Sequence, residues 1–184
     1  MHLRKLYHTI EQFASAEYKT DAELLTNVLH NIVRNEDIEI KGGRLWKLDT
    51  KAGTYRLIEQ VGDVEPIRKN FELKVSDYTM FLDLVHKRTI LSTETNQYLR
   101  QRGIVKYSAT GVGELVKWKR HQLFPYVLAF NSNFINEATL HTLNVISTSL
   151  TSILQKRKNE RKTELLERDL DLARAIQRRI LPER

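Results

Sequence analysis

The stretch from 134 to 181 contains neither glycine nor proline, and this restricts the fold more than any other feature of the sequence. Pro182 is the first residue that must end a helix, because its ring removes a backbone donor. Ser132 or Asn133 suits the N-cap, and Glu137 suits the first turn. Such a helix would be roughly 70 Å long, so we expect it to run beyond the domain on which it packs.

This expected helix has three parts. The first has an apolar stripe that predicts packing on a sheet, formed by Leu140, Leu143, Ile146, Leu150, Ile153 and Leu154. The second, from Gln155 to Glu164, has no apolar side chain, so it should emerge into solvent. The third restores a stripe at alternating steps of four and three residues, the spacing of a coiled coil, with Leu166, Leu170, Ala173, Ile176 or Gln177, and Ile180.

Two heptads are too short to make a stable isolated coil. They could form a seam if the globular domains already held two chains together, so we predict a homodimer with a parallel two-chain seam. The polar second part favours this seam, because it separates the last stripe from the core of its own chain. A frayed single helix is the alternative.

Apolar periodicity near the N-terminus predicts two more helices, over 3–16 and 20–35. Thr20 or Asp21 could cap the second of these. Its core-facing stripe is Leu24, Leu25, Val28, Leu29 and Ile32.

The periodicity then changes to that of strands. Gly42-Gly43 predicts a break, followed by a hairpin of strands at 44–49 and 54–61. On the second strand we expect Tyr55, Leu57 and Val61 to share one side. The chain continues with a strand at 72–75, a helix from Asp77, a short helix over 96–102, and strands at 114–120 and 123–131. Residues 90–110 are otherwise mixed, so the sequence predicts an α+β fold with an antiparallel sheet of about five to six strands.

Charge and composition exclude several function classes. The chain has no cysteine, which excludes disulfides, thiolate zinc sites, iron–sulfur clusters and thioether-linked chromophores. The net charge is +7, and residues 155–184 carry +4 of it, with ten Lys and Arg against six Asp and Glu. A solvated helix face explains this better than nucleic-acid binding. No apolar run could span a bilayer and the N-terminus lacks the apolar core of a leader peptide, so we expect a cytoplasmic protein without membrane contact.

No catalytic arrangement is found in the sequence. The six histidines, His2, His8, His30, His86, His121 and His141, lack metal-ligand spacing. Gly111-x-Gly113 lacks the Lys-Ser/Thr of a phosphate loop. Asp169 and Asp171 would point about 200° apart on a helix. We therefore expect this part of the protein to have no enzyme activity, metal or cofactor of its own.

The element order resembles that of GAF domains over residues 15–157. Residues 44–57 are similar to the first two GAF strands. Residues 126–131, followed by Phe134, are similar to the last GAF strand and the helix that closes the domain. The resemblance implies an N-terminal helix at 1–18, a sensor domain at 19–157 and a linker helix at 158–184. It also implies a ligand site between the sheet and the 77–110 region. Aromatic residues could line that site or fill the core: Tyr78, Phe81, Tyr98, Tyr107 and Trp118.

A shorter segment, 167–182, resembles the helix that precedes the catalytic domain of bacterial PPM-type serine phosphatases. The family pattern Glu-Leu-x-x-Ala-x-x-Ile-Gln-x-x-Leu-Leu-Pro is matched at Ala173, Ile176, Gln177, Leu181 and Pro182. The resemblance implies that a phosphatase domain with Mg²⁺ or Mn²⁺ follows and acts on a phosphorylated anti-sigma-factor antagonist. A stand-alone GAF-type interaction scaffold and a basic nucleic-acid-binding module are the alternatives.

Overall fold

The computed structural model describes residues 8–12, 15–93, 95 and 97–180. A six-stranded antiparallel sheet has the order β3-β2-β1-β8-β5-β4. Its strands are β1 (Ile40–Asp49), β2 (Thr54–Gly62), β3 (Glu72–Lys74), β4 (Thr89–Ser92), β5 (Lys106–Val112) and β8 (Tyr126–Ser132). A separate hairpin pairs β6 (Val116–Trp118) with β7 (His121–Leu123). The helices are α2 (Asp21–Arg34), α3 (Met80–Lys87), α4 (Gln97–Gln101) and α5 (Glu137–Ile180).

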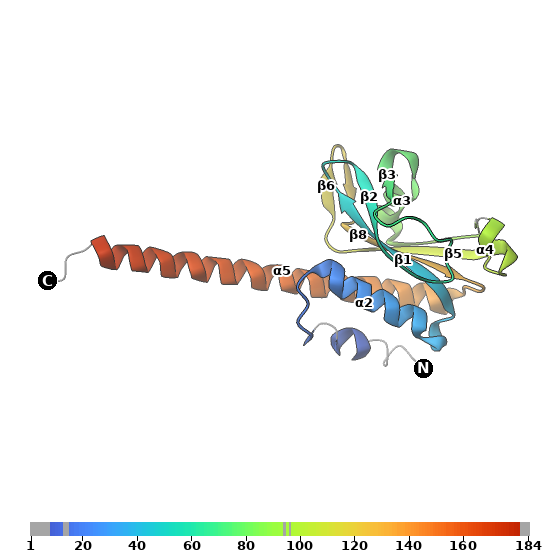
Figure 1. Cartoon of the computed structure of the whole chain (residues 1–184), viewed down its shortest axis with the longest axis horizontal. Coiled ribbons are helices and arrows are strands. Elements are labelled where there is room, and N and C mark those ends of the chain that lie inside the picture. Colours follow the sequence, from blue (N-terminus) through green and yellow to red (C-terminus); the bar gives the residue numbers. More distant parts are fainter. Residues whose placement is uncertain (1–7, 13–14, 94, 96, 181–184) are drawn as a thin grey trace.

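Helices cover both faces of the sheet (Figure 1). On one face α2 and the first part of α5 pack over β1, β8 and β5, and their buried residues include Leu29, Leu45, Phe130 and Ile146. On the other face α3 and the β6–β7 hairpin cover a second cluster that includes Trp46, Tyr55, Phe81 and Val127. The predicted α+β fold, with an antiparallel sheet of about five to six strands and a long last helix, is thus confirmed.

The helix at α2 follows the sequence pattern closely. Leu24, Leu25, Val28, Leu29 and Ile32 are all buried, as predicted. Thr20 is the N-cap, and its hydroxyl accepts a 3.1 Å hydrogen bond from the backbone N–H of Glu23. Of the helix expected over 3–16, residues 8–12 and 15 are helical and residue 16 forms a bend; residues 3–7, 13 and 14 lie outside the described residues.

The break predicted at Gly42-Gly43 and the mixed region predicted at 90–110 are wrong, because strands there contain small residues that lack a strand pattern. Gly42 and Gly43 lie inside β1, where a side chain would collide with the Asp63 backbone or with Leu29. The mixed region 90–110 supplies β4 and the interior strand β5. Residues 108–111 of β5 are buried, but Ser-Ala-Thr-Gly lacks the bulky apolar alternation by which strands are recognised.

The prediction for β2 fails at a bulge. Tyr55 and Leu57 share a cluster with α3, whereas Val61 packs on the opposite face with α2. The pairing register shifts between Leu45 and Trp46, and this inserts one residue into β2 and reverses the side-chain alternation beyond it. The strand expected at 114–120 is also shorter, since only Val116–Trp118 pair, and they do so outside the main sheet.

The last helix, α5, runs for 44 residues, or about 66 Å at 1.5 Å per residue. Asn136 caps it, since its Oδ1 accepts a 2.8 Å hydrogen bond from the N–H of Thr139. Ser132 and Asn133 were therefore the wrong cap candidates, because β8 continues to Ser132. Leu143, Ile146, Leu150 and Leu154 are buried, and every residue from 158 to 180 is exposed. This exposed part projects well clear of the domain (Figure 1).

Candidate functional site

A cleft of about 640 Å³ lies on the α3 side of the sheet. Its floor is formed by Arg44 and Trp46 of β1, Ala129 of β8 and Tyr107 of β5. One wall is the segment after β2, with Ile67, Phe71 and Leu73; the other is β4, with Ile90 and Leu91. The start of α3 closes the cleft through Thr79 and Met80.

Arg44 and Tyr107 are the polar groups of the cleft floor. An Nη2 of Arg44 donates to the backbone carbonyl of Glu65, while Nε is buried without a hydrogen-bond partner. Burial lowers the pKa of Arg44, and Tyr107 and Glu65 oppose this shift. Tyr107 donates its hydroxyl to Sδ of Met80 over 3.5 Å, a long contact to a weak acceptor.

Burial raises the pKa of Tyr107 from its ordinary value of 10.0 to about 12. The unfolded chain therefore loses this phenolic proton near pH 10, whereas the folded chain keeps it until about pH 12. We expect the contribution of Tyr107 to stability to be complete below pH 10 and to disappear between those two values. Urea unfolding at rising pH should show a smaller alkaline loss for Tyr107→Phe than for the parent. An identical loss would contradict this assignment.

The structure separates the five aromatic residues that the sequence singled out. Tyr78 and Tyr107 line the cleft. Phe81 is 1% exposed and stacks on Tyr55 with ring centroids 4.0 Å apart. Tyr98 lies on α4 beneath the guanidinium of Arg102, 4.3 Å from its ring centroid. Trp118 lines a different hollow beside Lys119 and His121. Ligand binding by any of these residues stays a prediction.

The sequence reading missed a clamp that holds α5 against the start of α2. Asp21 receives hydrogen bonds from Nε of Arg157 over 3.1 Å and from both terminal nitrogens of Arg161 over 3.1–3.2 Å. Arg157 also donates to the backbone carbonyl of Tyr18 over 2.8 Å. The side chains of Arg157 and Asp21 are only 16% and 19% exposed. This clamp fixes the point at which α5 leaves the domain.

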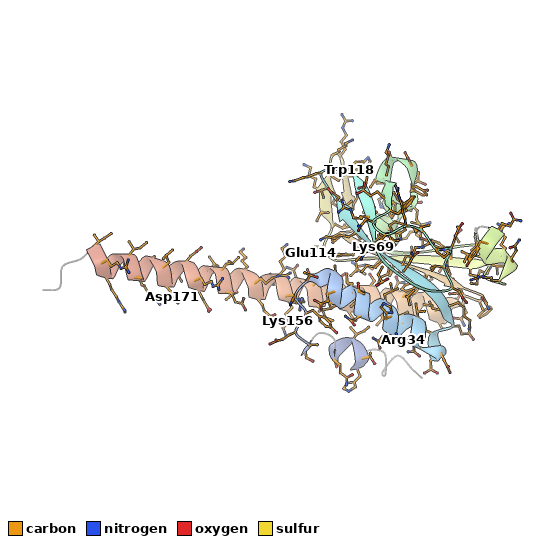
Figure 2. All side chains as sticks on the ribbon, viewed as in Figure 1. Arg34, Lys69, Glu114, Trp118, Lys156 and Asp171 are labelled. Atoms are coloured by element: carbon orange, nitrogen blue, oxygen red, sulfur yellow. The ribbon has the colours of Figure 1, made fainter. Side chains whose placement is uncertain are left out.

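We expect Asp21→Asn to lower the free energy of unfolding by about 2 kcal/mol, because two arginines lose a charged acceptor. Arg161 contributes the smaller share, since 48% of its side chain is exposed and water screens it. Urea denaturation measures the change. Asp171→Asn is the matched control: its side chain is 76% exposed, and Figure 2 shows it far along the projecting helix. Equal effects of the two substitutions would contradict a stabilising clamp.

The residues of the predicted seam lie together on the projecting part of α5. Leu166, Leu170, Ile176 and Ile180 are 48–72% exposed, and Ala173 and Gln177 are exposed between them. Leu165 and Leu172, which the sequence reading left out, are also exposed and widen this surface. At 100° per residue these eight side chains fall within an arc of about 160°. We call residues 165–180 on this arc the apolar face of α5.

Metal-binding and membrane-spanning features are not seen in the described part of the chain. Within residues 8–12, 15–93, 95 and 97–180 no three His, Asp or Glu side chains are grouped to hold a metal ion. In the same residues no helix combines the length and apolarity needed to cross a membrane.

Comparison with known proteins places the fold. No protein-family profile and no curated protein sequence matches the chain. It is similar to the GAF domain of an Acinetobacter phosphoenolpyruvate-protein phosphotransferase, with 12% identity, TM-score 0.61, and coverage of 88% of this chain and 98% of that chain. It is also similar to the free methionine-R-sulfoxide reductase of Neisseria meningitidis, with 11% identity, TM-score 0.62, and coverage of 86% of this chain and 91% of that chain. A third similar structure is the GAF domain of a Bacillus halodurans sensor histidine kinase, with 12% identity, TM-score 0.51, and coverage of 74% of this chain and 97% of that chain. The chain therefore has the fold of a GAF domain, with a helix that continues beyond it.

Proposed function

We propose that this chain is the sensory and dimerisation region of a bacterial signalling serine/threonine phosphatase, and that α5 carries the signal to the phosphatase domain. The supporting observation is the continuity of α5, which packs inside the domain as far as Leu154 and presents its apolar face outside it. The phosphatase-like segment at 167–182 supports the choice of output. The substrate of that output would be a phosphorylated anti-sigma-factor antagonist.

Polar contacts connect the cleft with α5. Arg88, which directly follows the cleft helix α3, donates from Nη1 to Oγ of Ser147 on α5 over 3.4 Å. Ser147 is fully buried and donates to the carbonyl of Gly111 on β5. A ligand that shifts α3 would therefore change a contact to α5 directly. Such a ligand acts by preferring one arrangement of the helix to another.

Further contacts tie α5 to the end of β5. The N–H of Gly113 donates to the hydroxyl of Thr151 over 3.0 Å, and Lys158 pairs with Glu114 over 3.0 Å. Figure 2 shows Glu114 above the part of α5 that leaves the domain. The helix is thus held along its packed length and released beyond the clamp at Asp21. A rotation or shift at the held end would move the whole exposed end.

Insertions into the charged stretch after Lys162, beyond the clamp at Asp21, test this transmission in the complete protein. Two extra helical residues rotate the apolar face by about 200° relative to the domain, whereas seven restore the phase to within about 20°. We expect the two-residue insertion to change dephosphorylation of the phosphorylated antagonist by roughly tenfold, and the seven-residue insertion by less than about twofold. Equal rates for both proteins and the parent would reject transmission through α5.

A further inference from the structure

The inner end of the cleft holds a cationic group, Arg44, whose Nε–H makes no hydrogen bond. Arg44 is fixed by its bond to the carbonyl of Glu65, but its Nε–H is buried and makes no hydrogen bond. A buried donor without a partner destabilises the folded state, and more so when the group is charged. Buried polar groups are nearly always paired in folded proteins. An unpaired guanidinium N–H on a cleft floor therefore points to an acceptor that arrives with a ligand.

A second donor lies on the same floor. The hydroxyl of Tyr107 has Sδ of Met80 as its partner, 3.5 Å away, and an anionic oxygen would be a far stronger acceptor. Ala129 lies directly opposite Arg44 in the β1–β8 pairing and directly opposite Ala109 in the β8–β5 pairing. Ala129 and Ala109 therefore present only methyl groups beside Arg44, and Asn131, which lies opposite Tyr107, donates its amide to the backbone carbonyl of Asp63 over 3.1 Å. This leaves room for a ligand group to approach both donors.

The rest of the cleft divides into apolar walls and a charged mouth. Trp46, Ile67, Phe71 and Ile90 line the walls. Glu65, Asp83 and Lys87 are exposed at the mouth, where solvent weakens their charges, although Glu65 still acts on the pKa of Arg44. Arg44 is the charged side chain on the cleft floor. A ligand that fits must combine a charged acceptor with an apolar body.

We propose that this cleft binds a small organic anion, with its carboxylate or phosphate on Arg44 and Tyr107 and its apolar body against Trp46 and Phe71. This ligand class rests on the sensory role proposed above and specifies it. The anion would displace Met80 from Tyr107, and Met80 is the first residue of α3. Binding at the floor thus reaches the helix that contacts α5 through Arg88.

The experiment follows the side-chain Nε–H signal of Arg44 by nuclear magnetic resonance while the protein is titrated with benzoate, phenyl phosphate or the neutral benzamide. At least one anion should shift this signal with saturation, and benzamide should not. Backbone signals of β5 report binding in the variants. Arg44→Met and Ala129→Leu should each weaken binding of that anion at least tenfold, the first by removing the charge and the second by filling the floor. Lys117→Met, which removes an exposed charge on β6 outside the cleft, should change binding less than twofold.

Benzoate binding alone would assign a carboxylate ligand, and phenyl phosphate binding alone a phosphate ligand; either supports the proposal. No shift with either anion, equal binding of benzamide, or an unchanged affinity in Ala129→Leu would overturn it. Ala129→Leu keeps the guanidinium of Arg44 and changes only the floor beside it, so the test holds even if Arg44→Met does not fold. Sedimentation of the same samples reports the dimer, and the insertion experiment reports transmission through α5, so a failed ligand class is distinguishable from a failed signalling role.

Discussion

The double substitution Leu170→Asp with Ile180→Asp should weaken self-association at least about 100-fold, which corresponds to roughly 2.7 kcal/mol. Both side chains lie on the apolar face of α5, and they are 57% and 72% exposed in the single chain. In a two-chain seam the substitutions would place four carboxylates in an apolar contact, and each buried charge without a partner costs several kcal/mol. Analytical ultracentrifugation over a range of concentrations measures the change.

Ala175→Asp is the matched control for this prediction. Ala175 is also exposed on the projecting part of α5, but on a helical wheel it points about 140° away from the centre of the apolar face. It introduces a charge at a similar distance from the domain without entering the seam, so we expect the dimer to persist. A parent chain that is monomeric, or a double variant that associates as strongly as the parent, would reject the homodimer.

The helices could be predicted from the sequence because each buries one apolar stripe along its own length. The stripe at 24–32 and the change of character along α5 near Gln155 both depend on local periodicity, and the structure reproduces them. The interior strand β5 could not be found in this way. Its buried residues Ser108, Thr110 and Gly111 have the composition of a loop, and only the strands on both sides make them a strand.

The cleft and the clamp were harder to predict for a different reason. Arg44 lies between a glycine and a leucine in a strand, and this local pattern is also that of an arginine exposed to solvent. Arg44 is enclosed in the cleft only because α3 and the 65–73 segment pack over this part of the sheet. Asp21 and Arg157 are 136 residues apart, and no local pattern relates them. The sequence shows an acidic residue in the first turn of a helix and a basic stretch far from it, but only the folded structure brings these two features into contact.

Phe81→Ala should lower the free energy of unfolding by about 4 kcal/mol and the melting temperature by roughly 10 °C. Phe81 was one of the candidate ligand residues, but its side chain is 1% exposed and lies in the cluster of buried residues between α3 and the sheet. Its ring stacks on Tyr55, whose hydroxyl donates to the carbonyl of Phe124 over 2.7 Å. Truncation leaves a cavity in this network that the fixed strands cannot close.

Tyr98→Ala is the control, since it also truncates a candidate aromatic residue but at the surface helix α4. There the ring is partly exposed and its described contact is with Arg102, so we expect a loss below about 1 kcal/mol. Guanidinium denaturation measures both variants. If Phe81→Ala costs less than Tyr98→Ala, Phe81 does not support the layer that covers the cleft. If it costs the expected 4 kcal/mol, Phe81 is a packing residue whose stack on Tyr55 holds α3 against the sheet.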